Sequence, residues 1–189
     1  MPKINSKYPE LRLTIIEDQS EALISHIKTG EIDIGILALP FDLNGLESIG
    51  IWNEDFYWVT HKDDIKAGKN EITAAELEES QLMLLEDGHC LKDHALEVCN
   101  LPRNAHHSVT AANLATLIQL VAGKMGTTLI PQIALQQLMA ANPLISKVHL
   151  NEPGPHREIA MILRPTYYGI NSANLLCDLI REELKTYFN

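Results

Sequence analysis

The chain has 189 residues, of which 46% are hydrophobic and 21% charged, so it can bury a substantial core as one domain or two small lobes. Its net charge of -10 and its 15 scattered lysines and arginines exclude a large nucleic-acid surface, because phosphate neutralisation needs clustered cations. The sequence has no secretion-signal pattern and no apolar run near the ~18 to 20 residues that span a bilayer, so we expect a cytoplasmic protein without membrane contact.

Strand and helix patterns alternate along the chain, which favours an α/β fold with mostly parallel sheets. In the first half the predicted elements are a strand over Leu11–Glu17, a helix over Glu21–Thr29, strands over Asp33–Leu39, Glu47–Ile51 and Phe56–His61, a short helix over Thr73–Glu79 and a strand over Gln81–Leu85. Ser20 is expected to cap the first helix and Gly30 to end it.

In the second half the predicted elements are a helix over Asn113–Ala122, a strand over Thr127–Ile130, a helix over Gln132–Met139, strands over Ile145–Leu150 and Glu158–Leu163, and a closing helix over Ser172–Phe188. A rigid turn is expected at Pro153–Pro155, where two prolines flank a glycine.

The segment Glu86–Cys99, EDGHCLKDHALEVC, places two cysteines nine positions apart at opposite ends of a predicted helix. With a rise of ~1.5 Å per residue, an intact helix would hold their Cα atoms ~13 Å apart and on opposite faces. A disulfide needs a Cα separation of ~5.5 Å. If these thiols pair, the helix between them must therefore unwind.

Cys90 is the strongest candidate for a reactive residue. It lies in a loop at the expected helix N-terminus, where the macrodipole and the free backbone N–H groups favour a thiolate that can react with peroxide. The nearby carboxylates of Glu86, Asp87 and Asp93 oppose that effect. A buried inert thiol is the alternative, since free cysteines are among the most buried residues.

The other two cysteines have simpler interpretations. Cys99 either belongs to an apolar helix face or acts as the thiol that condenses with an oxidised Cys90. Cys177 lies among leucines on the closing helix and is expected to pack in the core. An odd cysteine number without framework spacing makes any disulfide transient.

Metal and nucleotide sites are weakly supported. Cys90 and His94 are four residues apart, with Cys99, His106 and His107 downstream, but no CxxC pair or four-ligand spacing is present. The glycines of Gly123–Thr128 lack the P-loop pattern and lie between a helix and a strand. We therefore expect neither a metal nor a cofactor.

LLEDGHCLKDHALEVC closely resembles the sensing segment of the OxyR family, the peroxide-responsive group of bacterial LysR-type transcriptional regulators. KYPELRLTIIEDQSEALISHIKTGEIDIGILALP, LVAGKMGTTLIP and HREIAMILRP are also similar, although these stretches are shared more widely among LysR-type effector domains. EDGHCL with a second cysteine nine residues after the first is the specific signature.

The resemblance implies a regulatory domain of two Rossmann-like lobes, of the type II periplasmic-binding-protein kind. Lobe I would comprise residues 1–57 and 162–189 and lobe II residues 58–161, with Phe56–His61 and Glu158–Arg164 as the crossing strands. The family's N-terminal DNA-binding domain would be absent, so that DNA contact belongs to the missing segment.

The resemblance also implies roles for individual residues. Cys90 matches the peroxidatic cysteine and Cys99 the resolving one. The residues matching those that line the reactive pocket are Ser20, His89, Thr128 and Arg157. This chain departs from the family by having serine at 20 where threonine is common, Lys124 in place of a turn glycine, and alanine at 112 and 115.

The implied function is a sensor, not an enzyme: Cys90 reacts with hydrogen peroxide and forms a reversible disulfide with Cys99, which controls antioxidant gene transcription. A homodimer, a tetramer in the full-length protein, and a glutaredoxin or thioredoxin as reductant are further expectations. The main alternative is a non-redox small-molecule receptor of the same fold, in which Cys90 is incidental. A thiol peroxidase is a weaker alternative, because the chain lacks a PxxxTxxC motif.

Overall fold

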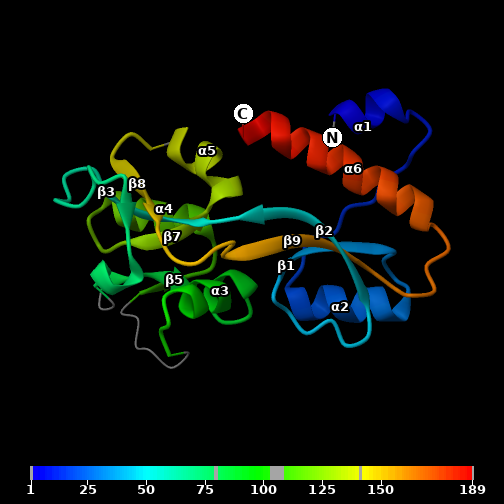
Figure 1. The fold of residues 1–189 in the computed structure, drawn as a ribbon, viewed down its shortest axis with the longest axis horizontal. Helices are drawn as coiled ribbons and strands as arrows, with labels where there is room; N and C mark the ends of the chain where they lie inside the picture. The colour runs from blue at the N-terminus through cyan, green and yellow to red at the C-terminus, as the bar shows by residue number, and fades with distance from the viewer. Residues whose placement is uncertain (1, 79–80, 103–108, 141, 189) are drawn as a thin grey trace. The chain divides into compact units, whose positions relative to one another are not determined.

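The computed structural model describes residues 2–78, 81–102, 109–140 and 142–188 (Figure 1). Its elements are α1 (Pro2–Lys7), α2 (Ser20–Thr29), β1 (Ile34–Leu39), β2 (Glu47–Glu54), β3 (Phe56–His61), β4 (Glu71–Ile72), the 3-10 helix η1 (Ala74–Glu76), β5 (Leu84–Leu85), α3 (Cys90–Val98), β6 (Thr110–Ala111), α4 (Leu114–Ala122), β7 (Thr128–Pro131), α5 (Gln132–Ala140), β8 (Ile145–Leu150), β9 (Arg157–Leu163) and α6 (Ile170–Phe188). Within the described ranges, no helix has the length and apolar character needed to cross a bilayer.

The chain forms two compact units. Unit 1 comprises residues 1–37, 42–52 and 160–189, and unit 2 comprises residues 38–41 and 53–159. The boundary between the units therefore falls inside β1, inside β2 and inside β9. The segment Phe56–His61, which was predicted to cross between lobes, lies wholly in unit 2 as β3, because β2 continues further than its apolar pattern suggested.

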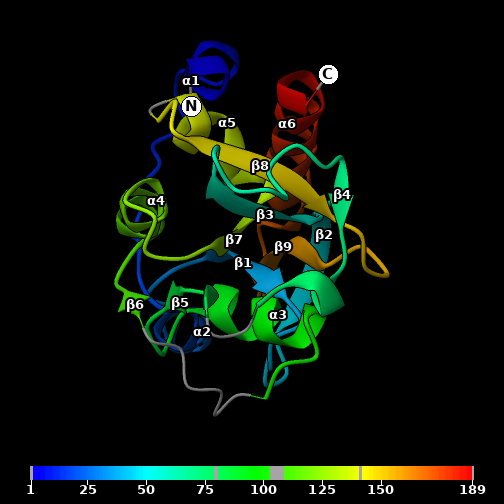
Figure 2. The same cartoon turned by 90° about the vertical axis from the view of Figure 1, so that its left-hand side faces the viewer.

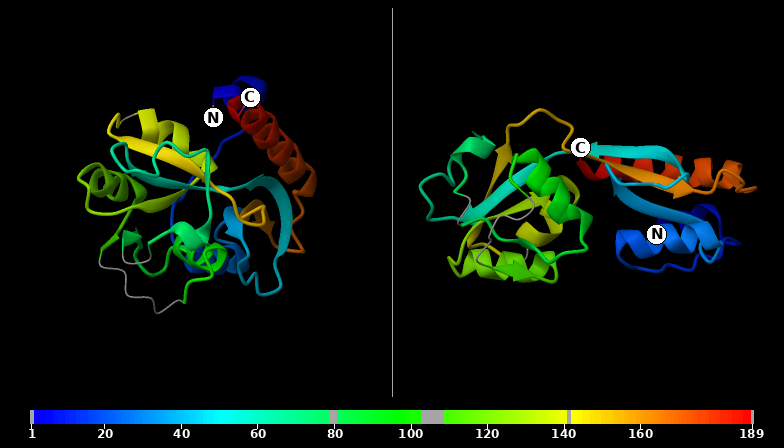
Figure 3. Two further views of the ribbon diagram at one scale, coloured as in Figure 1. Left: turned by 60° about the vertical axis from the view of Figure 1, so that its left-hand side comes forward. Right: turned by 90° about the horizontal axis from the view of Figure 1, so that it is seen from below.

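Unit 1 is built on a three-stranded sheet of order β1-β9-β2, with α2 on one side and α6 on the other (Figure 3). Ile27 of α2 is fully buried, and its side chain lies against Gly35 of β1. On the other side, Cys177 of α6 is fully buried and its thiol donates a weak hydrogen bond to the Gly50 carbonyl of β2. The prediction that Cys177 packs in the core is confirmed.

Helix α2 ends as predicted but begins one residue earlier than predicted. Gly30 adopts φ 81, a left-handed conformation that closes the helix C-terminus. The N-cap residue is Gln19, whose side chain makes no capping hydrogen bond, and Ser20 is the first helical residue and is buried. The N-cap position needs extended backbone, and here Gln19 supplies it.

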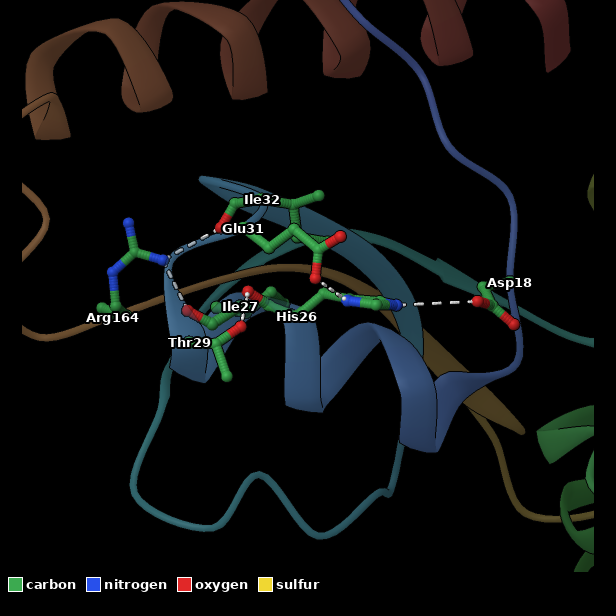
Figure 4. Close-up of polar contacts among 7 residues, drawn as sticks. All are labelled: Asp18, His26, Ile27, Thr29, Glu31, Ile32 and Arg164. Atoms are coloured by element: carbon green, nitrogen blue, oxygen red, sulfur yellow. Dashed lines mark hydrogen bonds and ion pairs between the residues drawn. The ribbon is translucent and has the colours of Figure 1, made fainter.

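Side chains from distant parts of unit 1 close the C-terminal end of α2 (Figure 4). Arg164, just after β9, donates hydrogen bonds to the carbonyls of Ile27 and Ile32. His26 contacts Glu31 through Nδ1, and its Nε2 lies 3.7 Å from Asp18. A guanidinium at this place gives the carbonyls near the helix end a charged donor, in addition to the Gly30 N–H that Ile27 already accepts, and it complements the negative end of the helix dipole.

The segment Leu11–Glu17 was predicted to be a strand, and that prediction is wrong. Residues 11–19 have no regular structure, and their side chains are exposed, with Ile15 at 68%. The alternation of apolar and polar residues is typical of a strand, but a strand forms only by pairing with a neighbour. The sheet of unit 1 contains β1, β9 and β2 and leaves this segment unpaired.

Unit 2 is built on a four-stranded sheet of order β4-β8-β3-β7. Strand β3 is antiparallel to both β7 and β8, and only β4 and β8 are parallel. The expectation of mostly parallel sheets is therefore wrong for this sheet, because the neighbours of β3 come later in the chain and run in the opposite direction. Just before β7, Thr127 forms an isolated parallel bridge with Leu82. Strands β5 and β6 form a separate short parallel pair.

The two faces of the unit 2 sheet carry separate hydrophobic cores. Figure 2 shows α3 and α5 on opposite sides of β3. Along β3, Phe56 and Trp58 face α3, whereas Val59 faces α4 and α5. Helix α3 contributes Leu96 and Cys99 to the first core. This packing fixes α3 against the sheet along most of its length.

Other predicted elements are shorter in the structure. The predicted helix Thr73–Glu79 is reduced to η1, in which Glu76 accepts a hydrogen bond from the Thr73 N–H; residue 79 lies outside the described residues. The predicted strand Gln81–Leu85 pairs only as β5 and at Leu82. Elements of two residues carry too few side chains for periodicity to reveal them.

Candidate functional site

Helix α3 begins at Cys90 and ends at Val98, with His89 as N-cap and Cys99 as C-cap. Gly88, with φ 94, makes the turn that leads from β5 into the helix. Cys90 is a partly exposed free thiol at the first helical position, where backbone N–H groups lack helical partners. The predicted position of Cys90 at a helix N-terminus is confirmed.

Two charged side chains near the start of α3 form an ion pair. Lys92 donates a 2.6 Å hydrogen bond to Asp87, and this contact lowers the pKa of the Asp87 carboxyl. Asp93 is a further acidic residue in the first turn of α3. The one lysine of this turn is thus engaged by a carboxylate rather than placed free beside the sulfur.

Cys99 lies in a very different environment. Its side chain is 8% exposed and packs in the core with Phe56, Trp58 and Leu96, among others. Burial raises the pKa of its thiol to about 12, with a further contribution from the charge of Glu152. Cys99 therefore stays protonated and unreactive while α3 is folded.

The intact helix keeps the two thiols apart. All three cysteines are free. The rise of an α-helix separates the Cα atoms of Cys90 and Cys99 by ~13 Å, against the ~5.5 Å of a disulfide. Cys99 can reach Cys90 only if the last turns of α3 leave the core.

We expect an alkylating agent to distinguish these thiols. At mildly alkaline pH, iodoacetamide should modify the folded chain once, at Cys90, because Cys99 and Cys177 are buried and burial raises the pKa of both thiols. Peptide mapping by mass spectrometry measures the modification. The Cys90→Ser variant should take up no label until urea unfolds it, and labelling of Cys99 at the rate of Cys90 would contradict the assignment.

Thr128 is a buried residue of β7 that adjoins the same region. Its hydroxyl donates a 2.9 Å hydrogen bond to the Met83 carbonyl, just before β5, and α3 packs against β5. The Thr128 proton is thus already used, so that the hydroxyl oxygen can act on a further group only as an acceptor. The turn before β7 contains Lys124 with φ 60, a left-handed conformation that favours glycine.

Arg157 forms a buried ion pair that the sequence did not reveal. Its Nε and one terminal nitrogen contact the same Glu54 oxygen at 2.7 and 2.6 Å, and both side chains are almost fully buried. The other Glu54 oxygen accepts the backbone N–H of Ile133 at the start of α5. The guanidinium also lies 5.7 Å from the Phe56 ring centre. Arg157 therefore joins β9, β2, β3 and α5.

The structure brings together some of the predicted site residues and leaves others apart. His89 and Cys90 are consecutive at the start of α3, and Thr128 lies by the segment preceding β5. Ser20 lies in unit 1, whereas the other predicted site residues lie in unit 2.

His94 is a residue whose environment the sequence did not reveal. It is 2% exposed, and its Nε2 donates a 2.9 Å hydrogen bond to the Pro40 carbonyl. Burial lowers its pKa, although the Pro40 bond opposes that shift, and the charge of Arg157 lowers the pKa further. Its spacing of four residues from Cys90 was the only signal in the sequence.

The metal alternative gains no support from the described part of the chain. No group of three or more histidine, cysteine, aspartate or glutamate side chains there could hold a metal ion. His106 and His107 lie outside the described residues. His94, the helix neighbour of Cys90, uses one ring nitrogen on a backbone carbonyl instead.

Comparison with known proteins identifies similar chains. The family model of the LysR substrate binding domain matches residues 1–185. The HTH-type transcriptional regulator EstR of Acinetobacter baylyi is 33% identical over 96% of this chain and 60% of its own length. A probable hydrogen peroxide-inducible genes activator of Mycobacterium avium is 35% identical over 95% of this chain and 58% of its own length. The chain thus spans less than two thirds of these relatives.

A solved structure of a similar protein supports the same family assignment. The peroxide-bound cysteine-to-serine mutant of Corynebacterium glutamicum OxyR has a TM-score of 0.88 and 26% identity, over 98% of this chain and 59% of that one. This likeness confirms the predicted α/β fold class, with the two-lobed topology of the type II periplasmic binding proteins.

Proposed function

Because the chain belongs to the LysR substrate-binding domain family, we propose that it is the redox-sensing regulatory domain of a bacterial LysR-type transcriptional regulator. One observation carries the proposal: a partly exposed thiol begins α3, and a buried thiol ends the same helix. Relatives named as hydrogen peroxide-inducible activators support it. The oxidant would be hydrogen peroxide.

The proposed chemistry has two steps. The Cys90 thiolate attacks one peroxide oxygen, so that an S–O bond forms, the O–O bond breaks, and the leaving hydroxide takes up a proton as water. The Cys99 thiol then attacks the sulfenic sulfur, a disulfide forms, and a second water leaves. His89, Ser20, Thr128 and Arg157 are the proposed peroxide-binding groups, with Thr128 acting as an acceptor.

The structural consequence of the second step is the signal. Bond formation requires the helix between the sulfurs to unwind and Cys99 to leave its core, so that the disulfide selects a different packing of residues 90–99. Each molecule consumes one peroxide per cycle, as a switch rather than a turnover enzyme. A glutaredoxin or thioredoxin would restore the thiols.

We extend the proposal to location and partners. The domain would act in the cytoplasm as a homodimer, within a tetramer of the full-length regulator, with lobe I at residues 1–57 and 162–189 and lobe II at 58–161. Its net charge of -10 argues that DNA contact is made outside this chain. Antioxidant genes would be the regulated targets.

The test is thiol titration and peptide mapping after equimolar peroxide. We expect loss of the Cys90 and Cys99 thiols together, a linked peptide that contains both, and an unmodified Cys177. The Cys90→Ser variant is the matched control and should keep Cys99 free. Recovery of Cys90 and Cys99 as free thiols after peroxide treatment of the unsubstituted chain would refute the proposal.

A second candidate function is a non-redox small-molecule receptor of the same fold. One observation favours it: EstR, whose name mentions no peroxide, is as similar to this chain as the peroxide-inducible activators are. A reporter driven by the full-length regulator separates the two. A full response with Cys90→Ser would establish the receptor, and loss of the response would establish the sensor.

A further inference from the structure

His94 has a buried ring nitrogen without a partner. Its Nδ1 makes no hydrogen bond with any residue that the structure describes, although the side chain is 2% exposed. Buried polar atoms are nearly always paired, because an unpaired one loses its hydration and gains nothing in return. Such an atom therefore indicates a contact still to be made.

The hydrogen bond at the other ring nitrogen fixes what Nδ1 can do. The Pro40 carbonyl can only accept, so that Nε2 must carry the hydrogen. Burial lowers the pKa of the ring, and Arg157 adds to this effect, so that the neutral form is favoured. In that tautomer Nδ1 bears a lone pair and can only accept a proton.

The helix determines which donor is in reach. Because residues four apart share one helix face and helical side chains lean toward the N-terminus, we expect the His94 ring to lie over the first turn of α3, although Nδ1 makes no hydrogen bond to the Cys90 sulfur in this structure. Cys90 and Leu91 are the residues of that turn nearest to this face. Only Cys90 has a side-chain proton to donate.

We propose that Nδ1 of His94 accepts the thiol proton of Cys90 and so positions the sulfur for attack. The proposal deepens the proposed function and rests on it for the peroxide step. The proton of the Cys90 thiol moves to Nδ1 as the sulfur attacks a peroxide oxygen, and it then passes to the leaving hydroxide to give water. Burial of the ring disfavours a lasting imidazolium, which favours prompt release of that proton.

Two substitutions separate the two ring nitrogens. His94→Gln keeps an amide N–H at the distance of Nε2, so that it can still donate to Pro40, but it lacks an acceptor at the Nδ1 position. His94→Asn places an amide oxygen near Nδ1 and gives up the Pro40 bond. The reactivity and the stability of the domain should therefore respond to different variants.

The experiment measures second-order rates of Cys90 with iodoacetamide and with hydrogen peroxide, and the melting temperature of each variant. We expect His94→Gln to slow both reactions by about tenfold with an unchanged melting temperature. His94→Asn should keep the rates within about threefold and melt at a lower temperature. Iodoacetamide needs no peroxide site, so its rate reports the contact even if the disulfide never forms.

Three outcomes would overturn the proposal. They are unchanged rates in both variants, equal loss in both, and loss confined to His94→Asn, which would tie reactivity to the Pro40 bond instead. Failure of the sensor function has a different signature, namely the expected alkylation pattern together with free Cys90 and Cys99 thiols after peroxide.

Discussion

Replacing Arg157 with alanine is expected to lower the free energy of unfolding by about 3–5 kcal/mol. The substitution leaves the Glu54 carboxylate in a place where its side chain is fully buried, with the Ile133 N–H as its remaining hydrogen-bond donor in the described part of the chain. A buried charge without its counter-ion costs far more than the loss of a surface pair. Urea denaturation followed by circular dichroism measures the change.

Two control variants show whether the loss of stability comes from the uncompensated buried charge of Glu54. Glu54→Gln combined with Arg157→Met removes both charges and keeps an acceptor for Ile133, so that it should be more stable than Arg157→Ala by about 2 kcal/mol. Lys124→Ala breaks the exposed Lys124–Asp63 pair and should have little effect. If Arg157→Ala changes the free energy of unfolding only slightly, the prediction is wrong, and the role of Arg157 is binding and not stability.

Oxidation by equimolar peroxide is expected to raise the hydrogen-exchange rates of the α3 amides by about a hundredfold or more. The disulfide cannot form across an intact helix, and its formation withdraws Cys99 from the core that it shares with Leu96 and Trp58. Mass-spectrometric exchange on reduced and oxidised protein measures the effect, with the peptide of α4 as internal reference.

The control for exchange is the Cys90→Ser variant treated with the same peroxide, which should exchange like the reduced protein. A uniform increase across unit 2 would indicate general damage instead of a local refolding. Unchanged protection of α3 in a chain shown to contain the disulfide would contradict the geometric argument.

The long periodic elements could be predicted from the sequence. Helix α2 with Gly30 at its end, and α6 with Cys177 in its apolar face, follow from residue spacing alone. Leu11–Glu17 shows the limit, because its strand pattern is real but pairing depends on a neighbour that no local pattern specifies. The same limit explains the antiparallel neighbours of β3.

In the candidate site, too, local spacing could be predicted from the sequence, whereas long-range side-chain pairing could not. The cysteine spacing fixed the central geometry, because both thiols belong to one helix. Glu54 and Arg157 are separated by 103 residues, and His94 contacts Pro40 across 54 residues, so neither pairing leaves a local signal. Side-chain pairing over such separations needs the folded chain.

The central claim is that the sulfurs of Cys90 and Cys99 can form a disulfide only when α3 unwinds. The most direct test is a structure of the oxidised domain, solved from protein whose disulfide has first been verified by mass. We expect Cys90 bonded to Cys99, with residues 90–99 out of the helix and Cys99 out of its core. An oxidised chain with this disulfide and with α3 superimposable on its reduced form would contradict the claim.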